Sequence, residues 1–378
     1  MRFDFAAPHR ILFGEGAARE AAPAARGMGR RVLLVTGRSP ERAAAVAGGL
    51  DSVPLAVTGE PTLEIVREGA RLARENGCDV VLAVGGGSAI DAGKAVAALM
   101  TNGGDPLDYL EVIGKGQPIE KPSAPFIAVP TTAGTGSEAT RNSVLASTEG
   151  RVKASLRSPF MLPRLAIVDP ELTFGLPPAL TASTGLDALT QLIEPYCSVR
   201  ANPMTDMFCV EGMTRAREAL PRACADGADR EARASMAFAS LLGGLSLANA
   251  GLGAVHGFAA PVGGSFPAPH GAVCAALLPH VMEINITALR ARAPAGLARY
   301  ATVAGILTGR PGAQPEDGAK WVRELCARLQ VPPLSAYGVS PQHVPALVEQ
   351  ASKASSMKAN PIALTREELT MILERAIR

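Results

Sequence analysis

A glycine-rich loop carries one of the two clearest chemical signals in this sequence. An apolar run at residues 80–84 leads directly into three glycines and a serine at residues 85–88, and a helical pattern follows. Glycines leave backbone N–H groups accessible to an anion, and the start of the next helix offers the positive end of its dipole to the same place. The pattern indicates a diphosphate site, although a bare triple glycine is more often only a tight turn. The residues expected to serve the diphosphate are Gly86, Gly87, Ser88 and Asp91.

A second loop of glycines and hydroxyl groups changes that balance. It reads PTTAGTGSE at residues 130–138 and follows an apolar run at residues 126–129. Taken alone it is a polar connection, but two such loops after two parallel strands would lie together at the carboxyl ends of one sheet. A ligand crevice becomes the better interpretation. The residues of this loop expected to contact a cofactor are Thr131, Thr132 and Thr135.

The elements that must hold these loops are strands alternating with helices. We expect strands at residues 32–35, 55–57, 80–84, 126–129 and 165–168, and helices at 39–47, 63–76 and 89–99. Strands separated by helical crossovers predict a parallel sheet that is covered on both faces. The turn-rich segment at Pro177 and Pro178 marks the expected boundary. The predicted domains are 1–178, α/β and Rossmann-like, and 179–378.

The second half of the chain favours helices throughout, and no alternating β pattern interrupts them. The expected helices are residues 180–197, 203–220, 231–250, 288–307, 318–329, 340–355 and 365–377. Residues 234–282 contain no Asp, Glu, Lys or Arg, but Gly, Pro, Asn and His residues interrupt them too often for membrane spans. We expect this stretch to form buried helices at the centre of the second domain.

Composition excludes several classes of function. A chain of 378 residues with 47% hydrophobic content is large enough for two cores. Its 37 basic and 35 acidic residues nearly cancel, which argues against nucleic-acid and membrane partners. Arg2, Asp4 and Pro8 interrupt what a secretory signal would need, so we expect a cytoplasmic protein. The six cysteines form no CxxC pair and are expected to be small core residues rather than a disulfide framework or a thiolate zinc site.

Four motifs in this order resemble the metal-dependent, iron-containing alcohol dehydrogenase family. They are GGGSAID, PTTAGTGSE, GLDALTQLIEPY and AVHGFAAPVGGSFPAPHGAVCAALLPHVM. The resemblance runs from the first strand to the last helix. It implies a dinucleotide-binding α/β domain followed by an all-helical domain, the fold shared with dehydroquinate synthase. It also implies an oxidoreductase that acts on a small alcohol or aldehyde and forms a homodimer or a larger homo-oligomer.

The resemblance also implies a divalent metal, Fe²⁺ or Zn²⁺. In that family an Asp and a His four residues apart, on one helical face, share the ion with two further histidines. The matching positions here are Asp187, Gln191, His256 and His270. Gln191 is a poor donor, but one carboxylate and two imidazoles still supply three protein ligands. Another family histidine is replaced by Ala260.

The cofactor implied is NAD(P)H. Where NAD-preferring members resemble one another in carrying an Asp after the first strand, this chain has Gly37 followed by Arg38. Without that carboxylate a 2′-phosphate is not repelled, so we predict that NADPH serves at least as well as NADH. Lys153 matches a family lysine near the nicotinamide ribose, whereas a surface lysine is its ordinary interpretation.

These parts predict hydride transfer between the nicotinamide and a carbonyl that the metal polarises. A maleylacetate reductase-like enzyme is the alternative from the same architecture, and dehydroquinate synthase is disfavoured because its richer set of basic and metal-binding residues is not seen here. A third alternative is a nucleotide-binding pseudoenzyme that has lost its metal together with the histidine at position 191.

Overall fold

The fold of the chain is described by a computed structural model that covers residues 2–147 and 152–378. Its chain contacts divide it into two compact units. The α/β unit comprises Ala6–Thr132 and Gly136–Phe174. Among the described residues the helical unit comprises 2–5, Ala133–Thr135 and Gly175–Arg378.

The α/β unit is built on a parallel sheet. Among the described residues six strands pair in the order β1-β8-β5-β4-β2-β3, and every pairing is parallel. The strands are β1 (Ile11–Phe13), β2 (Val32–Thr36), β3 (Ser52–Ala56), β4 (Val80–Gly85), β5 (Phe126–Pro130) and β8 (Leu165–Val168). The helices of this unit are α1 (Ala21–Met28), α2 (Pro40–Ala47), α3 (Leu63–Glu75), α4 (Gly87–Asn102) and α5 (Pro106–Tyr109). The α/β architecture expected from the sequence is confirmed.

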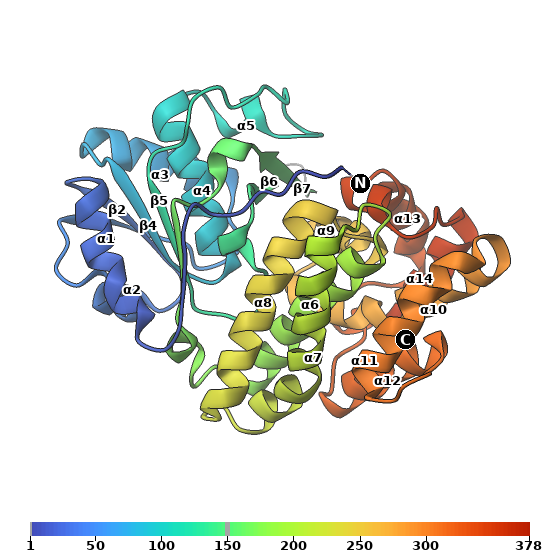
Figure 1. Ribbon diagram of the computed structural model, residues 1–378. Coiled ribbons are helices and arrows are strands. Elements are labelled where there is room, and N and C mark those ends of the chain that lie inside the picture. The colour runs from blue at the N-terminus through green and yellow to red at the C-terminus, as the bar shows by residue number, and fades with distance from the viewer. Residues whose placement is uncertain (1, 148–151) are drawn as a thin grey trace. The chain divides into compact units, whose positions relative to one another are not determined.

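Helices cover both faces of the sheet, as Figure 1 shows for the α/β unit. Side chains that alternate along each strand separate into two cores, because successive residues of a strand point to opposite faces. Leu33 and Val35 pack with helices α3 and α4, whereas Val32 and Leu34 pack with α1 and α2. Double-sided burial explains why the central strands are almost uninterrupted apolar runs.

Three strands lie outside the predicted set. The edge strand β1 is only three residues long and pairs with β8 alone. Strands β6 (Asn142–Ser147) and β7 (Val152–Arg157) form a separate antiparallel pair. Both are partly exposed and mix Ser, Asn, Lys and Arg with small apolar residues, so neither displays the long apolar run by which the other strands are predicted.

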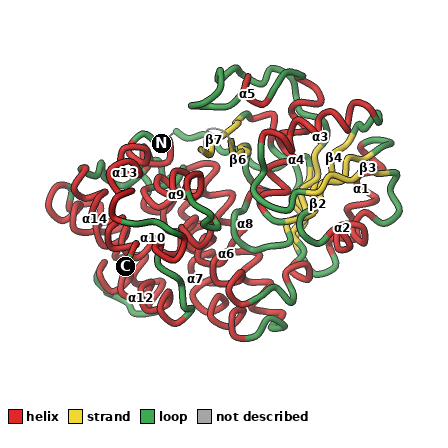
Figure 2. Tube along the Cα trace, turned by 180° about the vertical axis from the view of Figure 1, so that it is seen from behind, coloured by secondary structure: helices red, strands yellow, loops and turns green. Residues whose placement is uncertain are grey.

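The helical unit contains all the long helices of the second half of the chain, drawn in red in Figure 2. They are α6 (Pro178–Cys197), α7 (Pro203–Ala225), α8 (Arg230–Ala250), α9 (Ala254–Ser265), α10 (His270–Arg292), α11 (Leu297–Thr308), α12 (Pro315–Arg328), α13 (Val344–Ser352) and α14 (Arg366–Ile377). Thr365 caps α14 by accepting a hydrogen bond from the N–H of Glu368, whose carboxylate accepts one from the N–H of Thr365. The all-helical second half is confirmed.

One predicted helix is wrong. The sequence favoured a helix at residues 288–307, but α10 ends at Arg292 and α11 begins at Leu297. Pro294 explains the break, because a proline forces the preceding residue out of the helical conformation, and Ala293 accordingly has φ −154° and ψ 63°. The true start of α10 lies inside the charge-free stretch, where a helix buried on every side shows no amphipathic period.

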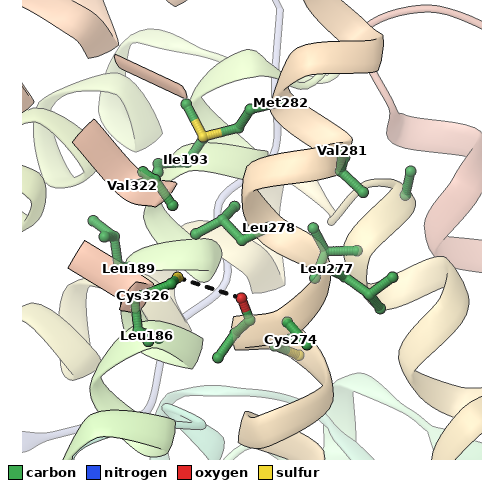
Figure 3. Packing of buried hydrophobic residues seen from close by; sticks show 14 of the residues in the cluster. Leu186, Leu189, Ile193, Cys274, Leu277, Leu278, Val281, Met282, Val322 and Cys326 are labelled. Atoms are coloured by element: carbon green, nitrogen blue, oxygen red, sulfur yellow. Dashed lines mark hydrogen bonds between the residues drawn. The ribbon is translucent and has the colours of Figure 1, made fainter. Parts of the chain in front are cut away.

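That charge-free stretch forms most of α8, all of α9 and the first part of α10. Among the described residues α10 alone is long and apolar enough to cross a membrane as one helix, and 83% of its apolar window is buried inside the structure. Figure 3 shows it packed against residues of α6 and α12. The core cysteine Cys326 donates a hydrogen bond there to the carbonyl oxygen of Ala275, with 3.5 Å between sulfur and oxygen. These contacts make α10 a core helix of the helical unit.

Candidate metal centre and cofactor loops

The two predicted loops lie side by side in the α/β unit. Strands β4 and β5 are neighbours, and Gly85 is in register with Pro130. Beyond the strands the N–H of Thr131 donates to the carbonyl oxygen of Gly85 at 2.9 Å. The third loop of the set follows β2, where the N–H of Gly37 donates to Val84 at 3.3 Å. The carboxyl ends of three adjacent strands therefore present their loops at one edge of the sheet, as a dinucleotide site requires.

At the junction of β4 and α4, the two adjacent glycines Gly85 and Gly86 are required for different reasons. A Cβ on Gly85 would lie 2.6 Å from the Cβ of Ala89 and 3.0 Å from the nitrogen of Gly37, so protein packing demands a glycine there. A Cβ on Gly86 would meet only the side chain of Thr132, at an ordinary 3.5 Å. Gly86 is the N-cap of α4, and no side chain caps that helix among the described residues. Its bare backbone, with Gly87 and Ser88 in the first turn of α4, is thus suited to an anion.

Asp91 is engaged by the protein itself. One carboxylate oxygen accepts a hydrogen bond from the hydroxyl of Ser137, and the other accepts one from the N–H of Val144 at 2.9 Å. The ammonium group of Lys94 lies 3.2 Å from the first oxygen. Asp91 therefore joins α4 to the end of the second loop and to β6, and its carboxylate is committed to those contacts.

Three other candidate cofactor residues have defined places. Arg38 is exposed, and its Nε donates to the carbonyl oxygen of Thr58 at 2.9 Å. Lys153, on β7, is not a surface lysine: its side chain is only 4% exposed, and its Nζ lies 2.8 Å from the carboxylate of Glu60. Thr135 groups with the helical unit, whereas Thr131 and Thr132 group with the α/β unit.

Four potential metal-binding side chains meet inside the helical unit. Asp187 on α6, His256 on α9, and His270 and Cys274 on α10 place one ligand atom each within 4.8 Å of all the others. Asp187 Oδ1 is 3.3 Å from His256 Nε2 and 3.7 Å from His270 Nε2. Cys274 Sγ is 3.8 Å from His256 Nε2 and 3.7 Å from His270 Nε2. The structure thus brings together the three predicted ligands and adds a thiol.

Small residues let the three helices approach closely enough. Gly271 directly follows His270, and a Cβ on it would lie 2.6 Å from the carbonyl oxygen of Ser183, so the first turn of α10 rests on the backbone of α6. Gly253, the N-cap of α9, leaves no room for a Cβ against the carboxylate of Glu194, which would be 2.9 Å away. The glycines beside the two histidines therefore follow from helix packing.

Glu194 holds His256 in place. Its carboxylate accepts hydrogen bonds from the Nδ1 of His256 and from the N–H of Val255, both at 2.7 Å, and it sits at the positive end of α9. With its proton on Nδ1, His256 turns the lone pair of Nε2 towards Asp187 and Cys274. A carboxylate behind a histidine in this way is the usual support of a metal-binding imidazole.

The charges of the cluster are strongly coupled. Burial opposes the charged form of Asp187, but the imidazoles of His270 and His256 outweigh it and lower the pKa of Asp187. Burial likewise opposes the charged form of both histidines, yet the neighbouring Cys274 and Asp187 raise the pKa of His256 and of His270. A cation bound here can replace the imidazole protons that the Asp187 carboxylate otherwise attracts.

The donor set fits a small divalent ion. Two donors on one tetrahedral zinc stand about 3.3 to 3.6 Å apart for bonds of about 2.0 to 2.3 Å. Four of the six separations within the set run from 3.3 to 3.8 Å, and none exceeds 4.8 Å. In addition, the buried Oδ1 of Asp187 accepts no well-formed hydrogen bond from any described residue. A buried carboxylate oxygen without such a partner is costly unless something else binds it.

The structure also shows where the two residues that depart from the family pattern, Gln191 and Ala260, lie. Gln191 is 2% exposed, one turn after Asp187 on α6, and its Oε1 is likewise buried without a hydrogen-bond partner among the described residues. Ala260 lies on α9, one turn after His256. Cys274 is the site residue that sequence reasoning missed. The signal that pointed to it was its place four residues after His270, on the same face of one helix.

Comparisons with known proteins give one family over nearly the whole chain. The model of "Iron-containing alcohol dehydrogenase" matches residues 8–170, and that of "Fe-containing alcohol dehydrogenase family, C-terminal" matches residues 181–377. Alcohol dehydrogenase 4 of Saccharomyces cerevisiae is 35% identical over 98% of each chain. The NAD-dependent methanol dehydrogenase of Bacillus methanolicus is 33% identical over 99% of this chain and 100% of its own. The crystal structure of 1,3-propanediol oxidoreductase covers 100% of both chains with a TM-score of 0.90 and 33% identity.

The parallel sheet with loops of glycine and hydroxyl residues at one edge, and the buried carboxylate, imidazoles and thiol of the helical unit, are the parts that a nicotinamide-dependent metallo-oxidoreductase requires. Within that class the chain belongs to the iron-containing alcohol dehydrogenase family. It is an alcohol dehydrogenase that depends on a nicotinamide cofactor and a divalent metal.

Proposed function

We propose that this enzyme transfers hydride between NAD(P)H and a small alcohol or aldehyde, with the metal held by Asp187, His256 and His270. The observation that carries the proposal is the convergence of these three donors from three helices, with separations that suit one ion. A divalent ion there supplies a Lewis acid for the substrate carbonyl and stabilises the alcohol oxygen in the reverse direction. The side chain of His270 is 35% exposed, whereas those of Asp187 and His256 are 2% and 7% exposed, so the substrate reaches the centre past His270.

The α/β unit binds the cofactor in this proposal. Gly86, Gly87 and Ser88 present backbone N–H groups to the diphosphate, and Thr131 and Thr132 supply hydroxyls from the adjoining loop. Asp91 acts through Ser137 and Val144 by fixing the second loop against α4. Thr135 and Lys153 complete the proposed contacts. The proposed domain roles are cofactor binding for residues 1–178 and metal and substrate binding for residues 179–378.

We further propose that NADPH serves at least as well as NADH. Gly37 offers no carboxylate to repel a 2′-phosphate, and the bond from Arg38 to Thr58 engages Nε rather than the two terminal nitrogens. Steady-state kinetics with both cofactors, in wild type and Arg38→Ala, test this. A clear preference for NADH that Arg38→Ala leaves unchanged would refute it.

The proposal extends to assembly and location. Exposed apolar side chains on α7, Met207 at 64% and Val210 at 37%, support a homodimer or larger homo-oligomer. All six cysteines are free thiols, which supports a reducing cytoplasmic compartment.

Metal removal and reconstitution test the function directly. The purified enzyme is treated with EDTA and then assayed for NAD(P)H oxidation with aldehydes, hydroxyaldehydes and keto acids, with Zn²⁺, Fe²⁺ or no metal added. We expect activity with small aldehydes only after a metal returns. Equal activity without metal would overturn the Lewis-acid role. If the enzyme binds the cofactor but turns over no substrate, whichever metal is added, it is a pseudoenzyme. A strict preference for maleylacetate would indicate the maleylacetate reductase-like alternative.

A further inference from the structure

We infer that Cys274 is the fourth protein ligand of the metal and that its thiolate makes the centre a zinc site. This inference rests on the proposed function, since it assumes an ion between Asp187, His256 and His270. It adds a donor of a different element, sulfur, that neither the family resemblance nor the cysteine spacing assigns.

The position of Cys274 on α10 provides the first support. It lies four residues after His270, so the two side chains project from the same face of the helix. Its sulfur is nearly equidistant from the two imidazoles, 3.7 Å from His270 Nε2 and 3.8 Å from His256 Nε2. Two donors on one tetrahedral zinc, one sulfur and one nitrogen, are about 3.6 Å apart. Both separations match that value.

The second support is a contrast with another buried cysteine. Cys326 Sγ donates to the carbonyl oxygen of Ala275, and burial raises the pKa of its thiol to about 12, as expected of an inert core cysteine. Cys274 is just as deeply buried, at 0% exposure, but the polar atoms at its sulfur are two imidazole nitrogens. Its surroundings are those of a ligand.

The third support is an independent sign of a cation site. The Oδ1 of Asp187 and the Oε1 of Gln191 are both buried without a well-formed hydrogen bond from any described residue. The Asp187 carboxylate belongs to the four-atom cluster. Two side chains could supply the fourth metal ligand, Gln191 and Cys274, and the amide of Gln191 is the weaker donor. A thiolate at Cys274 fills that position instead.

The resulting donor set also selects the metal. One carboxylate, two imidazoles and one thiolate are donors that suit Zn²⁺, whereas oxygen-preferring ions gain little from sulfur. Zinc in enzymes can expand to five ligands, so four protein donors still leave a fifth position for the substrate oxygen. Binding releases the thiol proton to the buffer, because the ligand is the thiolate. Cys274 is fully buried, whereas the side chain of His270 is 35% exposed, so the solvent-accessible donor of the cluster is His270 and not the sulfur.

Cobalt spectroscopy tests the inference independently of activity. Metal-free wild type is loaded with Co²⁺, which occupies zinc sites and gives a near-ultraviolet charge-transfer band only when a thiolate binds it. We expect one Co²⁺ per chain with this band in wild type, and loss of the band in Cys274→Ser. The matched control, Cys326→Ser, alters a buried cysteine outside the cluster and should retain it. Thermal unfolding by circular dichroism verifies that both variants are folded.

Metal competition provides a second readout. Cys274→Ser should raise the dissociation constant for Zn²⁺ by at least about tenfold, while that for Mn²⁺ changes much less. If Co²⁺ binds to wild type without the band, or the band survives in Cys274→Ser, the inference about Cys274 is overturned and the three-ligand proposal stands. If wild type binds no divalent metal, both fail. Should Cys274→Ser not fold, the wild-type spectrum alone still decides whether a thiolate is bound.

Discussion

The cofactor loops of the α/β unit and the metal cluster of the helical unit are built in opposite ways. The loops offer mainly backbone groups, from short segments that directly follow β2, β4 and β5. At Gly86 the important feature is the lack of a side chain, which leaves the backbone accessible. The cluster is made of side chains, contributed by α6, α9 and α10, that are far apart in sequence. A backbone site tolerates many residue types but no added bulk, whereas a side-chain site fails when one donor is lost.

The largest effect is expected from breaking the side-chain site. His270→Ala should lose the metal and nearly all turnover together, because only two proposed ligands and one neighbouring thiol remain. Binding of the cofactor should persist, since its loops do not depend on that imidazole. Metal content by mass spectrometry, turnover and NADPH fluorescence titration measure the three properties.

The exposed His9→Ala variant is the control for that experiment, since its side chain lies in the α/β unit outside either site. If His270→Ala keeps full activity in metal-free buffer, hydride transfer proceeds without a Lewis acid and the metal centre is not catalytic.

Breaking the backbone site should give the reverse pattern. Gly86→Val should abolish cofactor binding while the fold and the metal remain, because the protein leaves room for a Cβ there but the diphosphate needs that space. Gly86→Ala should give a smaller loss of affinity. The surface variant Gly27→Val serves as control, since a Cβ there meets nothing within 4 Å. An unchanged cofactor affinity in Gly86→Val would show that the diphosphate does not bind at Gly86.

A smaller effect should follow from weakening the support of the metal site. Glu194→Gln keeps an acceptor for His256 Nδ1 but removes the charge that orients and polarises the ring, so zinc affinity should fall about 10- to 100-fold. Chelator competition measures this change. Cofactor affinity should stay at the wild-type value. A zinc affinity equal to that of wild type would show that Glu194 only caps α9.

The last prediction leaves both sites intact and compares two buried carboxylates. The pKa of Asp187 is lowered among its imidazoles, whereas burial raises the pKa of Glu138 to about 7, from 4.5, despite the charge of Lys94. The folded protein therefore binds the Glu138 proton more tightly than the unfolded chain does. Stability from this group is full below pH 4.5 and is lost as the pH rises through 7, by up to about 1.4 kcal/mol per pH unit.

Glu138→Gln should flatten that part of the pH profile. Urea unfolding at several values between pH 5 and 8 measures it, with the exposed variant Glu120→Gln as control. A profile of Glu138→Gln that falls as steeply as that of wild type would assign the pH dependence to other groups.

Local patterns in the sequence determined most of the fold. The apolar runs of β2, β4, β5 and β8 and the helical periods between them predicted the parallel sheet, because strands buried on both faces leave a continuous apolar signature. Short or partly exposed strands such as β1, β6 and β7 leave no such signature. The start of α10 was hidden for a related reason, since a helix without a solvent face has no period to read.

The two sites divide in the same way. The glycine loop by itself predicts a diphosphate site, since a backbone cradle is encoded by consecutive residues. The family resemblance indicated Asp187, His256 and His270, but only the tertiary structure decided what else lies beside them. In the sequence Cys274 has the pattern of a core cysteine. One of the two histidines beside its sulfur, His256, comes from another helix and is not near it in the sequence. The packing of α9 and α10 against α6, through Gly253 and Gly271, brings His256 and Asp187 to the pair formed by His270 and Cys274, and the local spacing of that pair does not contain this information.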